Sequence, residues 1–109
     1  MTETASDYLT ADDHEELEKL RAHYGRMVPR LTRTDYHAMK VLEALFAFKQ
    51  RYLSELRLTT KALADAAMLG ESHTTVAVQR LADLGIITVG RRTKAGSAFK
   101  INPPPEAKS

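Results

Sequence analysis

The chain of 109 residues contains no cysteine and no tryptophan, and only five glycines and four prolines. Without cysteine it has no disulfide, no thiolate zinc site and no cysteine nucleophile. No apolar run approaches the roughly 20 residues that a membrane span requires, and the acidic N-terminus lacks the basic and then apolar pattern of a signal peptide. We therefore expect a cytoplasmic protein of one domain, with no membrane partner.

Motifs for catalysis and for cofactor binding are also missing. The sequence has no glycine-rich phosphate loop, no dinucleotide fingerprint and no nucleophile elbow. Its four histidines are scattered, without the spacing of metal ligands. We therefore expect that the protein is not an enzyme and that it has no cofactor and no metal site.

The net charge of +2 is unevenly distributed along the chain. Residues 1–31 contain seven acids and four bases, a net charge of −3. Residues 32–109 contain seven acids and twelve bases, a net charge of +5. A positive segment of this kind favours a polyanion as partner.

Two long helices are predicted in the first half of the chain. The first spans residues 10–27, between a hydroxyl cap with a carboxylate three residues later and the helix breaker Pro29. The second begins after a cap at either Thr34 or Thr32 and runs to about Ser54, with apolar residues throughout.

The second half predicts two shorter helices and a hairpin. A helix capped by Thr59 ends at a turn over residues 68–70, and the helix after that turn runs to Leu84. Two β-rich runs follow, residues 86–89 and residues 98–101, and they flank a polar tip.

The second helix carries more apolar residues than a small domain needs, because it has two apolar stripes where one is usual. Either this helix is buried on most sides, or one stripe faces the core and the other faces a partner subunit. From the second alternative we predict a two-fold dimer. Its predicted interface consists of Leu17, Leu20, Tyr24, Met27, Val41, Leu45, Phe48 and Tyr52.

The order of helix, helix, turn, helix and hairpin resembles a winged helix-turn-helix domain. The segment LTTKALADAAMLGESHTTVAVQRLADLGIITV, residues 58–89, resembles the DNA-binding segment of GntR-like and MarR-like bacterial regulators. The matching features are the Thr59 cap, the dipeptide Leu63-Ala64 and the closing motif that runs from Leu81 to Gly85.

This resemblance implies a mainly α-helical fold with a small β-hairpin. The winged helix-turn-helix covers residues 32–102, and the helix before it, within residues 10–31, serves dimerisation or packing. We expect residues 1–9 and 103–109 to be disordered.

Two positions differ from the family pattern. Met68 stands where the turn usually has glycine, and Gly70 stands where a serine usually caps the recognition helix. A cap at Ser72 instead would press Arg80 against the core, which is costly for a charge. We therefore predict Gly70 as the cap, which turns inward Thr74, Ala77, Val78 and Leu81.

The resemblance implies a recognition helix beside a hairpin with a basic tip. Gln, Arg, Val and Thr side chains suit base edges in a major groove, and a tip with three cations and no acid, within residues 90–97, suits phosphates or the minor groove. No acid lies between Ser72 and Ala82, which is unusual for a helix face that is merely solvated. The predicted DNA contacts are Thr59, Thr60, Lys61, Ser72, His73, Thr75, Val76, Gln79, Arg80, Arg91, Arg92 and Lys94.

The function that follows is sequence-specific binding of double-stranded DNA by a homodimer. The resemblance implies a nucleoid-associated transcriptional repressor that occludes a promoter, with the helix of residues 71–84 in the major groove of an inverted repeat. One alternative is a replication or partition protein of a plasmid or mobile element. Another is a winged-helix module that binds proteins and no DNA. The sequence identifies no small-molecule effector.

Overall fold

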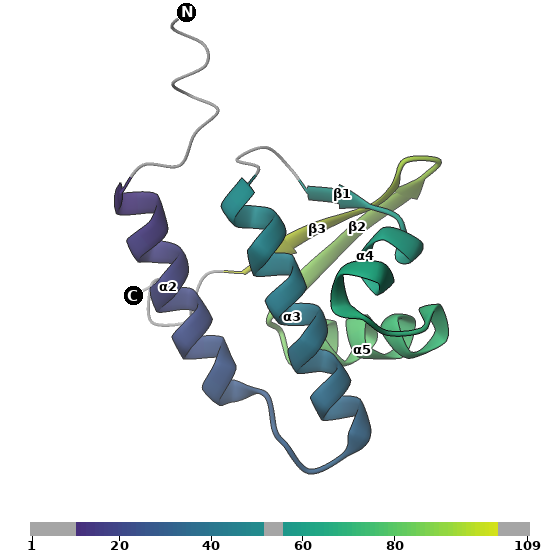
Figure 1. The fold of residues 1–109 in the computed structure, drawn as a ribbon, viewed down its shortest axis with the longest axis horizontal. Coiled ribbons are helices and arrows are strands. Elements are labelled where there is room, and N and C mark those ends of the chain that lie inside the picture. The colour runs from purple at the N-terminus through teal and green to yellow at the C-terminus, as the bar shows by residue number, and fades with distance from the viewer. Residues whose placement is uncertain (1–10, 52–55, 103–109) are drawn as a thin grey trace, which may run out of the picture.

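The computed structural model describes residues 11–51 and 56–102 (Figure 1). The helices in these ranges are α2 (Ala11–Met27), α3 (Arg33–Arg51), α4 (Thr60–Ala67) and α5 (Glu71–Asp83). The strands are β1 (Leu56–Leu58), β2 (Ile87–Thr93) and β3 (Gly96–Ile101). The prediction of a mainly α-helical fold with a small β element is confirmed, and the predicted disordered ends lie outside the described residues. Within the described ranges, no helix has both the length and the apolar character that crossing a membrane requires.

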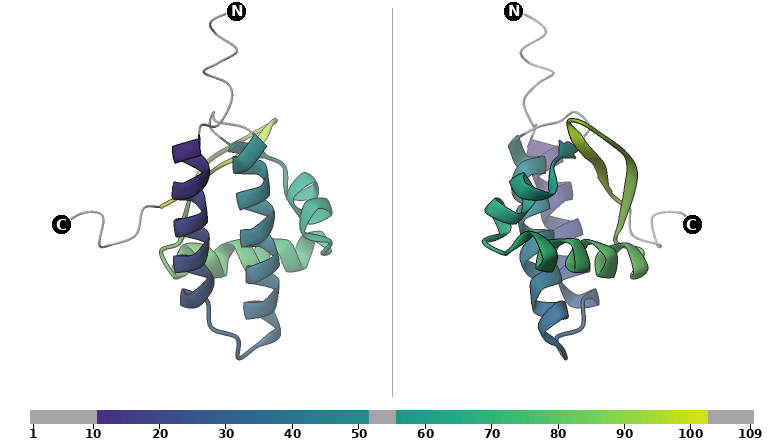
Figure 2. Two further views of the ribbon diagram at one scale, coloured as in Figure 1. Left: turned by 60° about the vertical axis from the view of Figure 1, so that its left-hand side comes forward. Right: turned by 90° about the vertical axis from the view of Figure 1, so that its right-hand side faces the viewer.

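The helices α2 and α3 lie side by side and antiparallel (Figure 2). A reciprocal cap fixes the start of α3. The Thr32 hydroxyl accepts the N–H of Asp35 at 3.2 Å, and a carboxylate oxygen of Asp35 accepts the N–H of Thr32 at 3.0 Å. Of the two candidate caps, Thr32 and Thr34, the structure therefore uses Thr32.

The segment from α4 to α5 folds as predicted. The Thr59 hydroxyl caps α4 by accepting the N–H of Ala62 at 3.0 Å. The turn contains Met68 with a φ of 59°, a left-handed conformation that glycine usually supplies. Gly70 is the N-cap of α5, so the predicted register is confirmed. The predicted inward residues are buried or, for Val78, half-buried: Thr74, Ala77, Val78 and Leu81.

The sheet has one strand more than the sequence predicts. Its order is β1-β3-β2, and both pairs are antiparallel. Residues 56–58, for which the sequence predicts no strand, form β1, in which Leu56 lies opposite Phe99. This pairing joins segments that are far apart in the chain, so no local pattern predicts it.

The hairpin is longer and its turn tighter than predicted. The prediction places a polar tip over residues 90–97, whereas β2 continues to Thr93 and β3 already begins at Gly96. Only Lys94 and Ala95 form the turn. The cations expected on the polar tip therefore stand on or beside paired strands.

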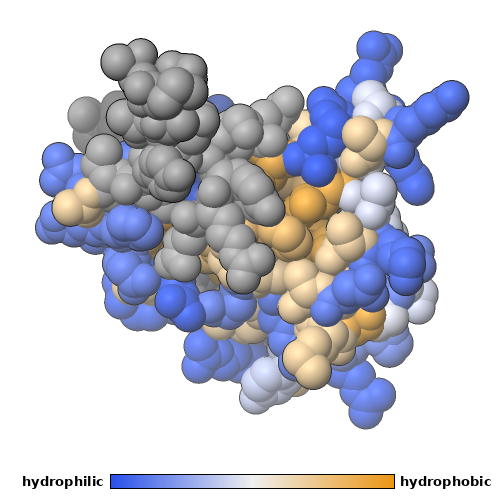
Figure 3. Space-filling model, turned by 45° about the horizontal axis from the view of Figure 1, so that its top comes forward, coloured by the Kyte–Doolittle hydropathy of each residue, from blue (hydrophilic) through white to orange (hydrophobic). Residues whose placement is uncertain are grey.

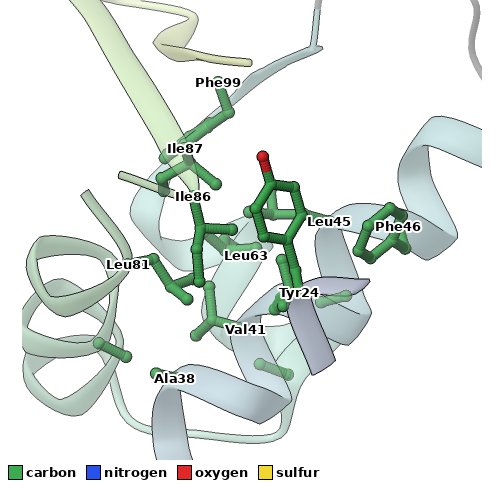
Figure 4. Packing of buried hydrophobic residues seen from close by; sticks show 14 of the residues in the cluster. Tyr24, Ala38, Val41, Leu45, Phe46, Leu63, Leu81, Ile86, Ile87 and Phe99 are labelled. Carbon is green, nitrogen blue, oxygen red and sulfur yellow. The ribbon is translucent and has the colours of Figure 1, made fainter. Parts of the chain in front are cut away.

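One hydrophobic cluster joins the helices to the sheet (Figure 4). Tyr24 is buried in this cluster, and its hydroxyl donates a hydrogen bond to the backbone oxygen of Asn102. This contact fastens α2 to the end of β3. The cluster residues labelled in Figure 4 are Tyr24, Ala38, Val41, Leu45, Phe46, Leu63, Leu81, Ile86, Ile87 and Phe99.

The predicted dimer interface is wrong for half of its residues. Four of them are buried within the single chain: Leu17, Tyr24, Val41 and Leu45. A buried side chain has no surface left for a partner, so the second apolar stripe of α3 belongs to the core. Of the others, Leu20 and Phe48 are half-buried against this core, Met27 is exposed, and Tyr52 lies outside the described residues. The structure thus agrees with the first alternative, a helix buried on most sides.

Candidate nucleic-acid interface

One side of the molecule brings together α4, α5 and the β2–β3 hairpin. In the right-hand view of Figure 2, α5 crosses this side, with the hairpin above it and the beginning of α3 below it. A groove of about 500 Å³ separates α4 and α5 from the hairpin. The groove is lined by predicted contact residues from all three elements: Thr60, Thr75, Gln79 and Arg92.

The outward face of α5 has the composition that the sequence predicts. Its exposed predicted contacts are Ser72, His73, Thr75, Val76 and Gln79. The Gln79 amide donates to the Asp83 carboxylate at 2.8 Å, one helical turn further on. Asp83 therefore places an acid at the end of this face, just beyond the acid-free stretch. The exposed positions are confirmed, and their contact with DNA stays a prediction.

Arg80 requires a correction, because it does not belong to the outward face. Its side chain is half-buried and turns toward α3, where Nε donates to Oδ1 of Asp35 at 3.1 Å. The other oxygen of this buried carboxylate accepts the backbone N–H groups of Leu31 and Thr32, at 3.1 and 3.0 Å. Arg80 thus fixes α5 against the start of α3, whereas the sequence predicted it as a DNA contact on the outward face.

The protonation state of Asp35 follows from these contacts. Burial acts to raise the pKa of the Asp35 carboxyl. The hydrogen bonds with the backbone N–H groups of Leu31 and Thr32, and then those with the side chains of Thr32 and Arg80, outweigh burial and hold this pKa below its ordinary value. The carboxylate is therefore ionised at neutral pH and neutralises the charge of the Arg80 guanidinium group.

The beginning of α4 presents a hydroxyl and a cation. Thr59 is exposed although its hydroxyl caps the helix, and Thr60 is half-buried at the groove. Lys61 lies 3.7 Å from Asp65, and both side chains are exposed. An exposed pair of this kind contributes little to stability, so Lys61 can exchange this partner for a phosphate.

The hairpin carries its cations at the surface. Arg91, Arg92 and Lys94 are all exposed, and no acidic side chain among residues 11–51 and 56–102 pairs with them. In Figure 3 hydrophilic side chains project from the end of the hairpin, at the upper right. Three unneutralised cations at this place are suited to phosphate groups.

A close backbone approach holds the hairpin in place. Gly96 has a φ of 113°, and a Cβ atom there would lie 2.2 Å from the carbonyl carbon and oxygen of Leu58. Only glycine allows β3 and the end of β1 to approach so closely. A bulge in β2 places Gly90 and Arg91 opposite Ala98, which changes the register ahead of Arg92.

Arg57 is an important residue that sequence reasoning missed. From β1 its Nη1 donates to the backbone oxygens of Arg91 and Gly96 and to the hydroxyl of Thr93, each at 3.2 Å. One side chain thus ties both strands of the hairpin to β1. The sequence contained one signal for this role, namely a charged residue between Leu56 and Leu58 in a run that is otherwise suited to burial.

The predicted contacts thus fall on one side of the molecule, with Arg80 as the exception that turns toward α3. Arg57 and Asp35, which the prediction lacks, position the hairpin and α5. No family model, no curated protein and no solved structure matches this chain. The function therefore has to be inferred from the residues of this interface.

Proposed function

We propose that this protein is a winged helix-turn-helix protein that binds double-stranded DNA, with α5 as the recognition helix and the hairpin as the wing. The observation that carries the proposal is a juxtaposition. The exposed face of α5, which has no acid between Ser72 and Ala82, stands across an open groove from the hairpin. No described acid neutralises the hairpin cations Arg91, Arg92 and Lys94. An α-helix fits the major groove, and cations beside it reach the phosphates.

The side chains on α5 suit base edges. The Gln79 amide can exchange its hydrogen bond with Asp83 for a bidentate pair with adenine. Val76 is 54% exposed, and such an apolar group on a polar face suits a thymine methyl group. Arg80 keeps its bond with Asp35 and has a positioning role. Specificity then rests on Ser72, Thr75, Val76 and Gln79.

The biological role that fits is transcriptional repression by occlusion of a promoter. A two-fold homodimer would place two α5 helices about 34 Å apart on an inverted repeat. Its interface has to use surface that the folded chain exposes, which excludes Val41 and Leu45. A replication or partition protein of a mobile element would use the same interface. A module that binds only proteins is disfavoured by the unneutralised cations of the hairpin.

Fluorescence anisotropy with a random 30-base-pair duplex tests the proposal over a series of salt concentrations. The wild-type chain should bind with a steep salt dependence. The variant Arg91→Gln/Arg92→Gln should bind all sequences more weakly, with a slope of log K against log salt that is smaller by about two.

The matched control removes two cations from another side. Lys19→Gln/Arg26→Gln on α2 changes the net charge equally and should keep the wild-type slope. Equal slopes for all three proteins would exclude the hairpin as a phosphate contact. A chain that binds no duplex at low salt would favour the protein-binding module.

A further inference from the structure

A notch on the other side of α5 lies outside the groove and the hairpin. It has a volume of about 290 Å³ and lies between α5 and the first turns of α3. Its walls consist of Arg33, Thr34, His37, Ser72, His73 and Val76. The rings of His37 and His73 face each other with their centres 4.7 Å apart and their planes at 36°. We call this feature the histidine notch.

The charges that face the histidine notch are positive. Arg33 and Lys40 act on His37 from its own helix, and His73 acts on it from α5. Arg80, also on α5, is neutralised by Asp35, whose carboxylate already accepts three hydrogen bonds. No acidic side chain among the described residues lines the notch.

These surroundings oppose protonation of His37. Burial is the largest cause that lowers the pKa of His37 from its ordinary value, and His73, Lys40 and Arg33 lower it further. The free protein therefore holds a neutral imidazole at pH 7 beside fixed positive charge. An anion in the notch would reverse the balance, because it favours the imidazolium form of both rings.

The histidine notch lies where a helix in a major groove would meet the phosphate backbone on the side away from the hairpin. A helix in this groove, which is about 12 Å wide, has a phosphate backbone on each side. The hairpin cations lie on one side of α5, and the start of α3 lies on the other (Figure 2). Ser72 and Val76 belong both to the outward face of α5 and to the notch.

We propose that the histidine notch binds a phosphodiester group of the DNA strand opposite the hairpin, and that this binding adds protons to the His37–His73 pair. The proposal rests on the proposed function and adds a pH-dependent contact to it. Protons are taken up on binding, so affinity rises as the pH falls. For each proton taken up the rise is at most about tenfold per pH unit.

Anisotropy with the random 30-base-pair duplex tests this at constant ionic strength between pH 8.0 and 5.5. Wild-type affinity should rise several-fold toward the lower pH. The variant His37→Gln/His73→Gln should lose most of this rise. The control His14→Gln removes an exposed histidine on α2, and its affinity should rise at lower pH as that of the wild type does. A double variant with the wild-type pH dependence would overturn the proposal.

Histidine titration by NMR on the wild-type chain provides a test without substitutions. The duplex should raise the pKa of His37, and it should move the ring signals of His73 but not those of His14. An unchanged pKa of His37 in a chain that binds the duplex would overturn the notch alone. A rise with inorganic phosphate but not with the duplex would identify a small-anion site and also overturn the proposal. A chain that binds no duplex at any pH would instead overturn the proposed function.

Discussion

Asp35 connects the loop before α3, α3 itself and α5. Its carboxylate is 1% exposed and accepts hydrogen bonds from Leu31, Thr32 and Arg80. The pKa of Asp35 in the folded protein is lower than its ordinary value, because these hydrogen bonds outweigh the effect of burial. A depressed carboxyl pKa stabilises the fold above the unfolded-state pKa, and this contribution is lost as the pH falls through the folded-state pKa.

Asp35→Asn should therefore destabilise the protein most at neutral pH. The substitution removes the negative charge that neutralises Arg80. It also places an NH2 donor where a carboxylate oxygen accepts a hydrogen bond. We expect a lower free energy of unfolding than wild type at pH 7, and a difference that shrinks below about pH 4 as the wild-type carboxyl is protonated. Urea denaturation at several pH values measures this. A difference that is as large at pH 3 as at pH 7 would show that the charge has no part in it.

Gly96→Ala should disrupt the contact between the hairpin and β1. The new methyl group would overlap the Leu58 carbonyl group, and the positive φ of residue 96 adds strain. We expect the free energy of unfolding to fall by about 2 kcal/mol or more. Gly25→Ala is the control, because Gly25 lies in α2 and a methyl group there would meet no atom of another element within 4 Å. Equal stability of the two variants would contradict the close approach.

At the scale of elements, Arg57 determines how firmly the hairpin is held. Arg57→Met keeps much of the aliphatic stem but removes the three hydrogen bonds to Arg91, Thr93 and Gly96. We expect faster amide hydrogen exchange in the hairpin and unchanged protection in α3 and α5. Uniformly faster exchange would mean that Arg57 stabilises the whole fold, and unchanged exchange would mean that the backbone pairing alone holds the hairpin.

The elements that the sequence predicted well are those with local signals. The Thr59 cap, the turn at Met68 and the Gly70 cap lie within a few residues of the helices that they bound. Strand β1 was missed because its partner Phe99 is remote in the chain. Arg80 was misplaced for the same reason, since the carboxylate that draws it inward is on another helix.

At the scale of the whole molecule, α2 covers the apolar surface that suggested a dimer. Leu17 and Tyr24 of α2 belong to the same buried cluster as Val41 and Leu45 of α3. The sequence predicted how much apolar surface α3 carries, but it did not predict that α2 covers this surface. Helix periodicity alone does not say which helix packs on which.

Leu45→Ala distinguishes a core role from an interface role. We expect it to lower the free energy of unfolding by about 2–5 kcal/mol, as for other buried leucines. The oligomeric state of the folded variant should equal that of the wild type in sedimentation velocity runs at micromolar concentration. Dissociation of a wild-type dimer by this substitution, without loss of stability, would restore the interface predicted from sequence.

The charge asymmetry of the sequence corresponds to two sides of the molecule. The acids of α2 are Asp12, Asp13, Glu15, Glu16 and Glu18. This helix lies on the opposite side of the molecule from α4 and the hairpin (Figure 1). A polyanion would therefore be attracted to the side of α4, α5 and the hairpin and repelled from α2.

Titration of the 15N-labelled chain with a DNA duplex, followed by amide chemical shifts, tests the central claim most directly. The proposed interface predicts shifts at the start of α4, along the outward face of α5 and in the hairpin around Arg91 and Arg92, with a further set at the start of α3. The amides of α2 should keep their positions. Shifts centred on α2, or a spectrum that does not change at low salt, would contradict the assignment of this face to DNA.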